Sequence, residues 1–205
     1  GLWTAYYLKQ AQPDLRVAVI EQRHAGYGAS GRNGGWLTNA ITGGREQYVK
    51  THGRDAAERM QREMNATVDE VIRVTQVEGI DADIKKGGEF NVAYAPAQEK
   101  RIREFAAAEQ AWKYTDLELL EAAEATAKIN VAGTMAAVWH PHSARIQPAK
   151  LAAGLAKAVE RLGVTIYEGT TALEIAPHRV VTDHGTVSAD FIVRATEGFT
   201  AGLKG

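Results

Sequence analysis

Hydrophobic residues recur at helical spacing at the start of the chain and then form a short continuous run. Within residues 2–11, the apolar stripe that contains Leu2 and Tyr6 predicts a helix. Pro13 marks a turn after it. Residues 16–20 (RVAVI) are almost wholly apolar and largely β-branched, which is typical of a strand buried on both faces of a parallel sheet. The pattern therefore predicts a helix followed by a buried strand.

The last third of the chain alternates helix and strand in a similar way. A helix is predicted from Pro148 to Leu162, and a strand over residues 164–168. Two further strands flank a turn at residues 183–185, as a hairpin or a β-meander. Residues 190–196 (DFIVRAT) are predicted to form another buried strand. Both ends of the chain therefore indicate an α/β arrangement.

The middle of the chain mixes helices with alternating strands. A helix is predicted over residues 55–78, where the stripe that contains Met60 and Met64 is interpreted as core packing. Alternation over residues 89–95 predicts a strand. The remaining predicted elements are a helix from Pro96 to about Trp112, a capping box at Thr115 and Glu118, and a strand over residues 134–139. This stretch is typical of an α+β unit.

Five glycines lie within the segment HAGYGASGRNGG, residues 24–35. Glycine loses more backbone freedom on folding than any other residue, so a packed helix or strand would not carry this many. Tyr27, Arg32, Asn33 and Trp36 do not suit a simple flexible spacer. The segment is therefore predicted to be a loop whose backbone must approach something closely.

The spacing of Gly1 and Glu21 fits a dinucleotide site. Such a site places a helix N-terminus at the pyrophosphate, with glycines for close approach and an acidic residue about 20 positions later for the ribose hydroxyls. Gly1 is then the third glycine of G-x-G-x-x-G, and we expect the first strand and the first two glycines to precede residue 1. For Glu21, an exposed charge after a strand is the alternative.

These elements predict three segments. Residues 1–42 and 148–205 form the two parts of a nucleotide-binding domain, and residues 43–147 form an insertion. The composition is that of a globular protein, with 45% hydrophobic and 24% charged residues. The formal net charge of −1 argues against a nucleic-acid partner.

Membrane and metal partners are also not expected. The chain has no apolar run that approaches the ~20 residues of a spanning helix, and a cytoplasmic location is the expectation. It begins at Gly1 without Met, so a targeting signal would belong to preceding residues. Cysteine is absent, which excludes disulfides and cysteine-based metal sites within these residues.

Three segments carry a resemblance to a known family. They are GASGRNGG (28–35), RIQPAKLAAGLAKAVERLGVTIYEGT (145–170) and IVRATEGFT (192–200). The chain resembles the D-amino-acid oxidase/glycine oxidase/sarcosine oxidase family, most closely its gamma-glutamylputrescine oxidase-like branch. The resemblance implies a Rossmann-like FAD-binding domain with an inserted α+β substrate domain. Glu197 departs from the glycine that is commoner at its position in this family.

The resemblance also implies a role for each cofactor residue by its position. Gly1 would lie at the pyrophosphate, Glu21 would hold the adenosine ribose, and Gln22 and Arg23 would lie near the adenine or ribose. The other implied FAD contacts are Ser30, Gly31, Arg32, Asn33, Gly34 and Gly35 at the pyrophosphate, ribityl chain and isoalloxazine edge, Thr171 and Ala172 at the adenine, and Ala195, Thr196 and Glu197 near the pyrophosphate and ribose. Bracing of the loop is the alternative for Arg32 and Asn33.

The activity implied by the resemblance is oxidation of a small-molecule amine or amino acid. The substrate gives hydride to FAD, and the resulting imine is hydrolysed. Because the flavin carries the difficult step, no catalytic side chain is assigned. Electron transfer to oxygen or to a quinone stays open, as does the oligomeric state. The alternatives are a truncated flavoprotein fragment without activity, which is expected of this stretch alone, and an NAD-dependent dehydrogenase domain.

A few other residues suggest chemistry less strongly. His140 and His142 flank a proline, and two histidines without a third ligand nearby do not make a metal site. They are interpreted as surface residues, with a contact to substrate or flavin as the alternative. Arg145 could pair with a substrate carboxylate or brace its loop. Trp36 is either a core residue or a neighbour of the flavin.

Overall fold

The computed structural model describes residues 1–203, and the chain forms two compact units. Unit 1 comprises Gly1–Gly34, Thr75–Ala82 and the chain from Gln147 onward. Unit 2 comprises Gly35–Val74 and Asp83–Ile146.

The units differ from the predicted segments 1–42, 43–147 and 148–205 in three places. Residues 35–42 lie in unit 2, residues 75–82 lie in unit 1, and Gln147 also lies in unit 1. The second difference arises because a helix of the middle segment ends in unit 1, where Tyr6 donates a hydrogen bond of 2.9 Å from its hydroxyl to Glu78 Oε1. Residues 204 and 205 of the last predicted segment lie outside the described residues.

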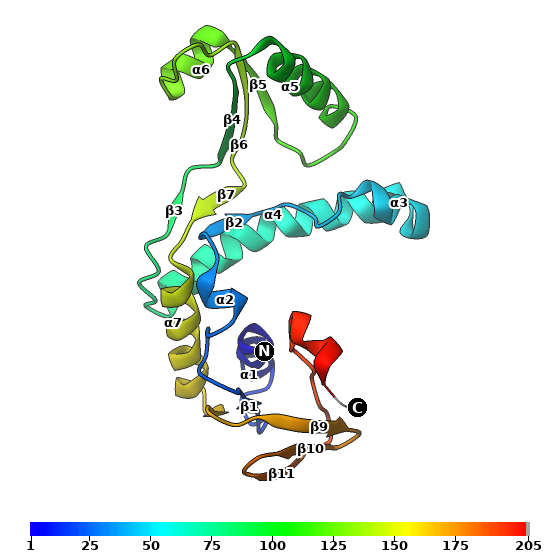
Figure 1. Ribbon diagram of the computed structural model, residues 1–205, viewed down its shortest axis with the longest axis vertical. Helices are drawn as coiled ribbons and strands as arrows, with labels where there is room; N and C mark the ends of the chain where they lie inside the picture. The colour runs from blue at the N-terminus through cyan, green and yellow to red at the C-terminus, as the bar shows by residue number, and fades with distance from the viewer. Residues whose placement is uncertain (204–205) are drawn as a thin grey trace. The chain divides into compact units, whose positions relative to one another are not determined.

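Unit 1 contains the α/β elements predicted at both ends of the chain (Figure 1). Its elements are α1 (Leu2–Ala11), β1 (Ala18–Ile20), α2 (Ala29–Arg32), α7 (Pro148–Arg161), β8 (Thr165–Tyr167), β9 (Ala172–Ala176), β10 (Arg179–Thr182), β11 (Gly185–Ser188) and the 3-10 helix η1 (Glu197–Gly202). Strand β1 pairs in parallel with β8. Helices α1 and α2 both contact α7, whose buried face includes Leu155 and Val159. The helix and parallel strand predicted at each end are confirmed.

Two predicted strands of unit 1 differ from expectation. In β1, Ala18 is exposed and Val19 and Ile20 are only half-buried, because among the described residues the strand pairs with β8 alone. Residues 190–196 form no strand, and Phe191 is 90% exposed. A strand needs a neighbouring backbone for its N–H and C=O groups, and no described strand pairs with this segment. Burial on both faces was therefore a wrong prediction for β1, and a buried strand was a wrong prediction for residues 190–196.

The hairpin predicted around residues 183–185 is present. Strands β9, β10 and β11 form an antiparallel sheet in which β10 is central. Thr182 lies opposite Gly185 across the turn, and the Thr182 hydroxyl donates a hydrogen bond of 2.8 Å to the Gly185 carbonyl. This side-chain bond satisfies a carbonyl at the tight end of the hairpin.

Unit 2 contains two antiparallel three-stranded sheets and four helices among the described residues (Figure 1). Its elements are β2 (Trp36–Thr38), α3 (Glu46–His52), α4 (Arg54–Val77), β3 (Lys85–Lys86), β4 (Glu89–Ala93), α5 (Pro96–Glu109), β5 (Glu118–Glu121), α6 (Ala122–Lys128), β6 (Ala136–His140) and β7 (Ser143–Arg145). The sheet orders are β2-β7-β3 and β4-β6-β5. Helices α5 and α6 pack against the second sheet, where Leu120, Ala125 and Ala137 are buried together.

The capping box lies at a different position from the prediction. Residues Glu118–Glu121 form strand β5, and the box is made by Glu121 and Glu124 at the start of α6. The Glu121 N–H donates a hydrogen bond of 3.0 Å to the Glu124 carboxylate. The prediction at Thr115 and Glu118 was wrong because the pairing of β5 with β6 places that segment in a sheet.

The buried face of α4 is polar in its first half. Met60 is 36% exposed and Met64 is half-buried, whereas Gln61 and Asn65 are buried beside Glu58. Asn65 Oδ1 accepts hydrogen bonds from Gln61 and from Asn39 at 3.1 and 2.8 Å. Hydrogen bonding therefore decides which face of this half of the helix is buried, and core packing was a wrong prediction for Met60, whereas Met64 is half-buried. Val68, Val71 and Val74 continue the buried face with apolar side chains.

Across residues 1–203, each helix is too short or too polar to cross a membrane. The cytoplasmic location expected from the sequence stays a prediction.

Candidate functional site: a cofactor cradle in unit 1

The N-terminus of α1 lies beside the turn that precedes η1. The Gly1 carbonyl accepts the first intrahelical hydrogen bond from the Ala5 N–H at 2.9 Å. A Cβ built on Gly1 would lie 3.8 Å from the Ala195 Cβ. Unpaired N–H groups in the first turn of a helix attract anions. The structure therefore brings together Gly1 and Ala195, which are distant in the sequence and were both predicted at the pyrophosphate.

The glycine-rich segment approaches the same part of unit 1. A Cβ built on Gly28 would lie 3.8 Å from the Phe199 ring, which belongs to η1. The segment contains the four-residue helix α2, which packs against α7. The predicted cofactor segments near residues 1 and 30 therefore both contact the third segment, from Ala195 to Phe199. In this way the three segments converge.

Two glycines of this segment have a packing role. Gly26 has a φ of +81°, and a Cβ built on it would lie 2.7 Å from the Ala152 Cβ of α7. A Cβ on Gly31 would overlap the Gly26 carbonyl oxygen. Gly34 differs, because a Cβ there would meet no described atom within 4 Å. The close approach predicted for the segment is therefore made to protein atoms at Gly26 and Gly31, and the space beside Gly34 is open.

One polar residue of the segment forms hydrogen bonds within it, and two others are exposed to solvent. Asn33 Nδ2 donates hydrogen bonds to the carbonyls of Ala29 and Ser30 at 3.1 and 3.3 Å, so it closes the short helix. Ser30 and Arg32 are exposed. Gly35 belongs to unit 2, where it is buried and its carbonyl accepts a hydrogen bond of 2.8 Å from Ile146.

The residues after β1 are hydrogen-bonded to the last residue of β8 and to the residues after it. The Glu21 N–H donates to the Tyr167 carbonyl at 2.9 Å, and the Glu21 carbonyl accepts from Thr170 at 3.0 Å. Glu21 Oε1 accepts the backbone N–H of Arg23 at 2.9 Å. These bonds fix Glu21 at the carboxyl end of a parallel strand, which is where ligands of open α/β sheets bind.

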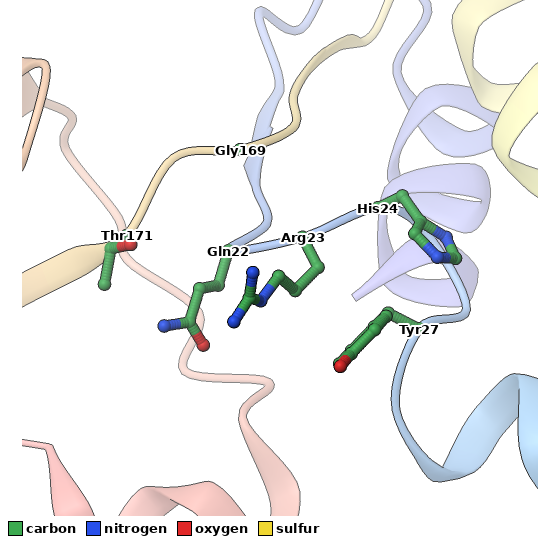
Figure 2. Close-up of a pocket in the computed structure, with 6 residues that line it drawn as sticks. All are labelled: Gln22, Arg23, His24, Tyr27, Gly169 and Thr171. Atoms are coloured by element: carbon green, nitrogen blue, oxygen red, sulfur yellow. The ribbon is translucent and has the colours of Figure 1, made fainter.

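An open pocket of about 630 Å³ lies at this edge of unit 1, within the size range of small-molecule sites. Figure 2 shows the side chains of Gln22, Arg23 and Tyr27 pointing into one space. The lining residues are Gln22, Arg23, His24, Tyr27, Gly169 and Thr171. Sequence reasoning assigned Gln22, Arg23 and Thr171 to the cofactor but missed His24, Tyr27 and Gly169. The position of Tyr27 within the glycine segment was the available signal.

Thr171 is hydrogen-bonded to Asp183 in the turn between β10 and β11. Its N–H donates a hydrogen bond of 2.8 Å to Asp183 Oδ1, and its carbonyl accepts one of 3.2 Å from the Asp183 N–H. The bond from the Thr171 N–H holds the pKa of Asp183 below its ordinary value. The Thr171 N–H is therefore already used. The Thr171 carbonyl oxygen can still accept one hydrogen bond from a ligand through its second lone pair. Ala172 begins β9 and pairs with Thr182.

The turn at residues 195–197 contains a strained residue. Glu197 has a φ of +47°, in the left-handed region that favours glycine. The N–H of Gly198 donates to the Glu197 carboxylate, and the hydroxyls of Thr196 and Thr200 are 2.8 Å apart. This backbone conformation explains why glycine suits position 197, and the local hydrogen bond offsets part of the strain at Glu197.

The other residues singled out in the sequence lie in unit 2. His142 Nε2 is 2.6 Å from Asp116 Oδ2, and His140 Nε2 is 3.5 Å from Glu89 Oε2. Burial lowers the pKa of His140 below its ordinary value. Within residues 1–203, no three of the histidine and carboxylate side chains are grouped to hold a metal ion.

Arg145 and Trp36 face each other in the register of β2 and β7, and both are exposed. The Trp36 indole N–H donates a hydrogen bond of 3.0 Å to Ser143 Oγ. Trp36 is therefore not a core residue, and its indole is fixed in place on the sheet.

The complete chain, residues 1–205, matches the profile of the DAO family, which is described as FAD dependent oxidoreductase. The chain belongs to this family. FAD is the cofactor of DAO enzymes, so the cofactor predicted from the sequence is confirmed for the family. The match overturns the alternative of an NAD-dependent dehydrogenase domain.

Individual DAO relatives agree with this assignment. The chain is 31% identical over 204 residues to gamma-glutamylputrescine oxidoreductase of Escherichia coli, a match that covers 97% of this chain and 47% of the relative. It is 25% identical to the probable oxidoreductase OrdL of Haemophilus influenzae, covering 94% of this chain and 46% of the relative. The chain thus spans about half the length of the curated relatives it matches.

Solved structures confirm the predicted fold class. The L-proline dehydrogenase of P. horikoshii superposes with a TM-score of 0.77 at 18% identity, covering 98% of this chain and 51% of the other. The glycine oxidase of Geobacillus kaustophilus gives a TM-score of 0.74 at 22% identity, covering 99% and 54%. These two likenesses establish the fold of the DAO chain.

Proposed function

We propose that unit 1 binds FAD and that the complete protein uses this FAD to oxidise an amine or an amino acid. The observation that carries the proposal is the convergence of segments distant in the sequence. Gly1 lies beside Ala195, Gly28 lies beside Phe199, and Glu21 is fixed at the carboxyl end of β1. A dinucleotide requires a helix N-terminus, a close-approach loop and an acidic residue within one site.

The residues present fit this cofactor. Gly1 is exposed at the start of α1, and the space next to Gly34 is open. We assign the pyrophosphate to the first turn of α1 and to the turn at Ala195, Thr196 and Glu197. The adenosine ribose is assigned to Glu21. The remaining proposed contacts are Gln22, Arg23 and Thr171 at the pocket, Ala172 beside them, and Ser30, Arg32, Asn33 and Gly34 in the glycine segment.

The names of several relatives support the substrate class. Gamma-glutamylputrescine oxidoreductase, glycine oxidase and L-proline dehydrogenase are all named for nitrogen-containing substrates. When bound, FAD supplies the acceptor for a hydride that leaves the carbon next to the substrate nitrogen. The residues of unit 1 hold and orient the cofactor.

The decisive experiment uses the complete reading frame. The purified full-length protein is expected to show flavin absorbance bands, and these bands are expected to bleach under anaerobic conditions with a polyamine or an amino acid. A 2-hydroxy acid is the matched control and is expected to leave the bands unchanged. A colourless, folded protein would reject FAD binding. A yellow protein that only the hydroxy acid bleaches would reject the substrate class.

Glu21 provides a test at a single residue. Replacing it by glutamine (Glu21→Gln) removes the charge that accepts ribose hydrogen bonds, and charged hydrogen bonds are worth enough that FAD affinity should fall about tenfold or more. Glu160→Gln is the control, because Glu160 is an exposed carboxylate on α7. Equal FAD affinities in the two variants, measured by flavin fluorescence on release, would remove Glu21 from the site.

A further inference from the structure

Tyr27 contacts two arginines in the glycine segment and at the pocket. The Arg32 guanidinium carbon lies 4.2 Å from the centre of the Tyr27 ring, and that of Arg23 lies 5.7 Å from it. The His24 ring meets Tyr27 edge-on at 5.4 Å. A guanidinium within about 6 Å of an aromatic ring is attracted by the ring quadrupole. One ring therefore contacts two cations, one on each side of it in the sequence.

Neither the Arg23 nor the Arg32 guanidinium forms an ion pair with a carboxylate of the described chain. Two carboxylates close by, those of Glu21 and Glu168, accept the backbone N–H groups of Arg23 and Ala25. Two like charges at one ring repel each other, so an anion next to them would be stabilised. The arrangement suits a ligand with at least two negative charges.

Of the two arginines, Arg23 lines the pocket together with Tyr27. Figure 2 shows the Arg23 guanidinium in the space between Gln22 and the Tyr27 ring. Tyr27 is 39% exposed, so one part of its ring remains accessible while another part contacts the arginines. Arginine side chains lose conformational freedom when a ligand orders them, and a ring that holds them beforehand reduces this loss.

We propose that Tyr27 is a positioning residue that holds Arg32 ready for the phosphate oxygens of the cofactor and Arg23 ready for the phosphate next to the adenosine ribose. Both arginines then add to the pyrophosphate contacts of the α1 first turn and the turn at Ala195. This inference rests on the proposed function, because FAD supplies the diphosphate. The contact uses the ring and not the hydroxyl, since cation–π attraction arises from the aromatic face. Phenylalanine at position 27 would therefore replace tyrosine, whereas leucine would not.

The test compares Tyr27→Leu with Tyr27→Phe in the full-length protein. FAD release is followed by flavin fluorescence over a range of NaCl concentrations. Tyr27→Leu is expected to weaken FAD binding about two- to fivefold at low salt, the size of an exposed cation–π contact. The FAD affinity of Tyr27→Leu is expected to decrease less steeply with rising NaCl concentration than that of the unchanged protein, because salt screens fewer positioned charges. Tyr27→Phe is expected to match the unchanged protein in both measurements.

Arg32→Gln keeps the proposal falsifiable if Tyr27→Leu does not fold. This change removes a charge from an exposed side chain and is expected to weaken FAD binding about tenfold and to flatten its salt dependence. In the double variant, the effects of Tyr27→Leu and Arg32→Gln are expected to be less than additive, since both remove the same interaction.

Three results would overturn the role of Tyr27. They are an unchanged salt dependence in both Tyr27→Leu and Arg32→Gln, a loss in Tyr27→Phe as large as that in Tyr27→Leu, and full additivity in the double variant. Each of these leaves FAD bound to the unchanged protein, so the proposed function would survive. A failure of the unchanged protein to bind FAD would instead reject the proposed function and this inference together.

Discussion

The two ends of the glycine-rich segment differ although they have nearly the same composition. Gly26 and Gly31 lie against each other and against α7, where an added methyl group would meet Ala152 or the Gly26 carbonyl oxygen. Gly34, three residues further on, has open space around its Cα among the described residues. The first end is closed by protein atoms, and the second end has room for a ligand.

This difference shows that glycine in a cofactor loop has two separate functions. The closed end lets α2 pack on α7, so it sets the position of the loop. The open end leaves space for the cofactor that we propose. A substitution at the closed end should therefore act on stability, and one at the open end on affinity for FAD.

The largest effect is expected for Gly31→Ala. The new Cβ would overlap a backbone oxygen, which cannot rotate away, so the loop has to shift. We expect a loss of more than about 2 kcal/mol in the free energy of unfolding, as for other severe steric changes. Urea unfolding of the full-length protein measures it. A variant as stable as the unchanged protein would contradict the closed packing.

A smaller loss in the free energy of unfolding is expected when Ala152, which contacts Gly26 from α7, is replaced by a larger residue. Ala152 is 6% exposed and faces Gly26, so Ala152→Val should lower the free energy of unfolding by about 1–3 kcal/mol through overpacking. Ala153→Val is the matched control, because Ala153 is exposed on the same helix. It should cost only about 0.5 kcal/mol, from the lower helix propensity of valine. Equal losses in the two variants would argue against the contact.

Gly34→Ala tests whether the open end of the segment contacts the cofactor. We expect the midpoint of thermal unfolding to stay unchanged, because nothing described in the protein occupies the space of the new methyl group. FAD affinity should fall about tenfold, which is the size of a modest steric clash with a ligand. Titration followed by flavin fluorescence measures it. Unchanged affinity would show that the cofactor does not approach this glycine.

The smallest effect is expected for Asn33→Asp between the two ends. Aspartate keeps the size of the side chain but cannot donate to the carbonyls of Ala29 and Ser30. The free energy of unfolding should fall by about 1 kcal/mol, the net value of an ordinary hydrogen bond. Urea unfolding at neutral pH is the measurement. No loss would mean that Asn33 does not brace the loop.

Some features of the fold and the site could be predicted from local sequence. Helices α1, α4 and α7 follow from apolar spacing, and Pro148 marks the start of the last of these. The glycine segment was expected to be a loop, but within it Ala29–Arg32 form the short helix α2, which packs on α7. The buried face of α4 was not predictable in the same way, because Gln61 and Asn65 are buried through hydrogen bonds with Asn39.

The sequence by itself determined helices α1, α4 and α7, the parallel pairing expected near Glu21, and membership of a family that uses FAD. These depend on periodicity and on short motifs, which are local properties. Only the tertiary structure decided which glycines are closed by protein, that residues 190–196 do not pair as a strand, and that Tyr27 contacts two arginines. Each of these depends on atoms brought together from distant positions, and local patterns do not contain that information.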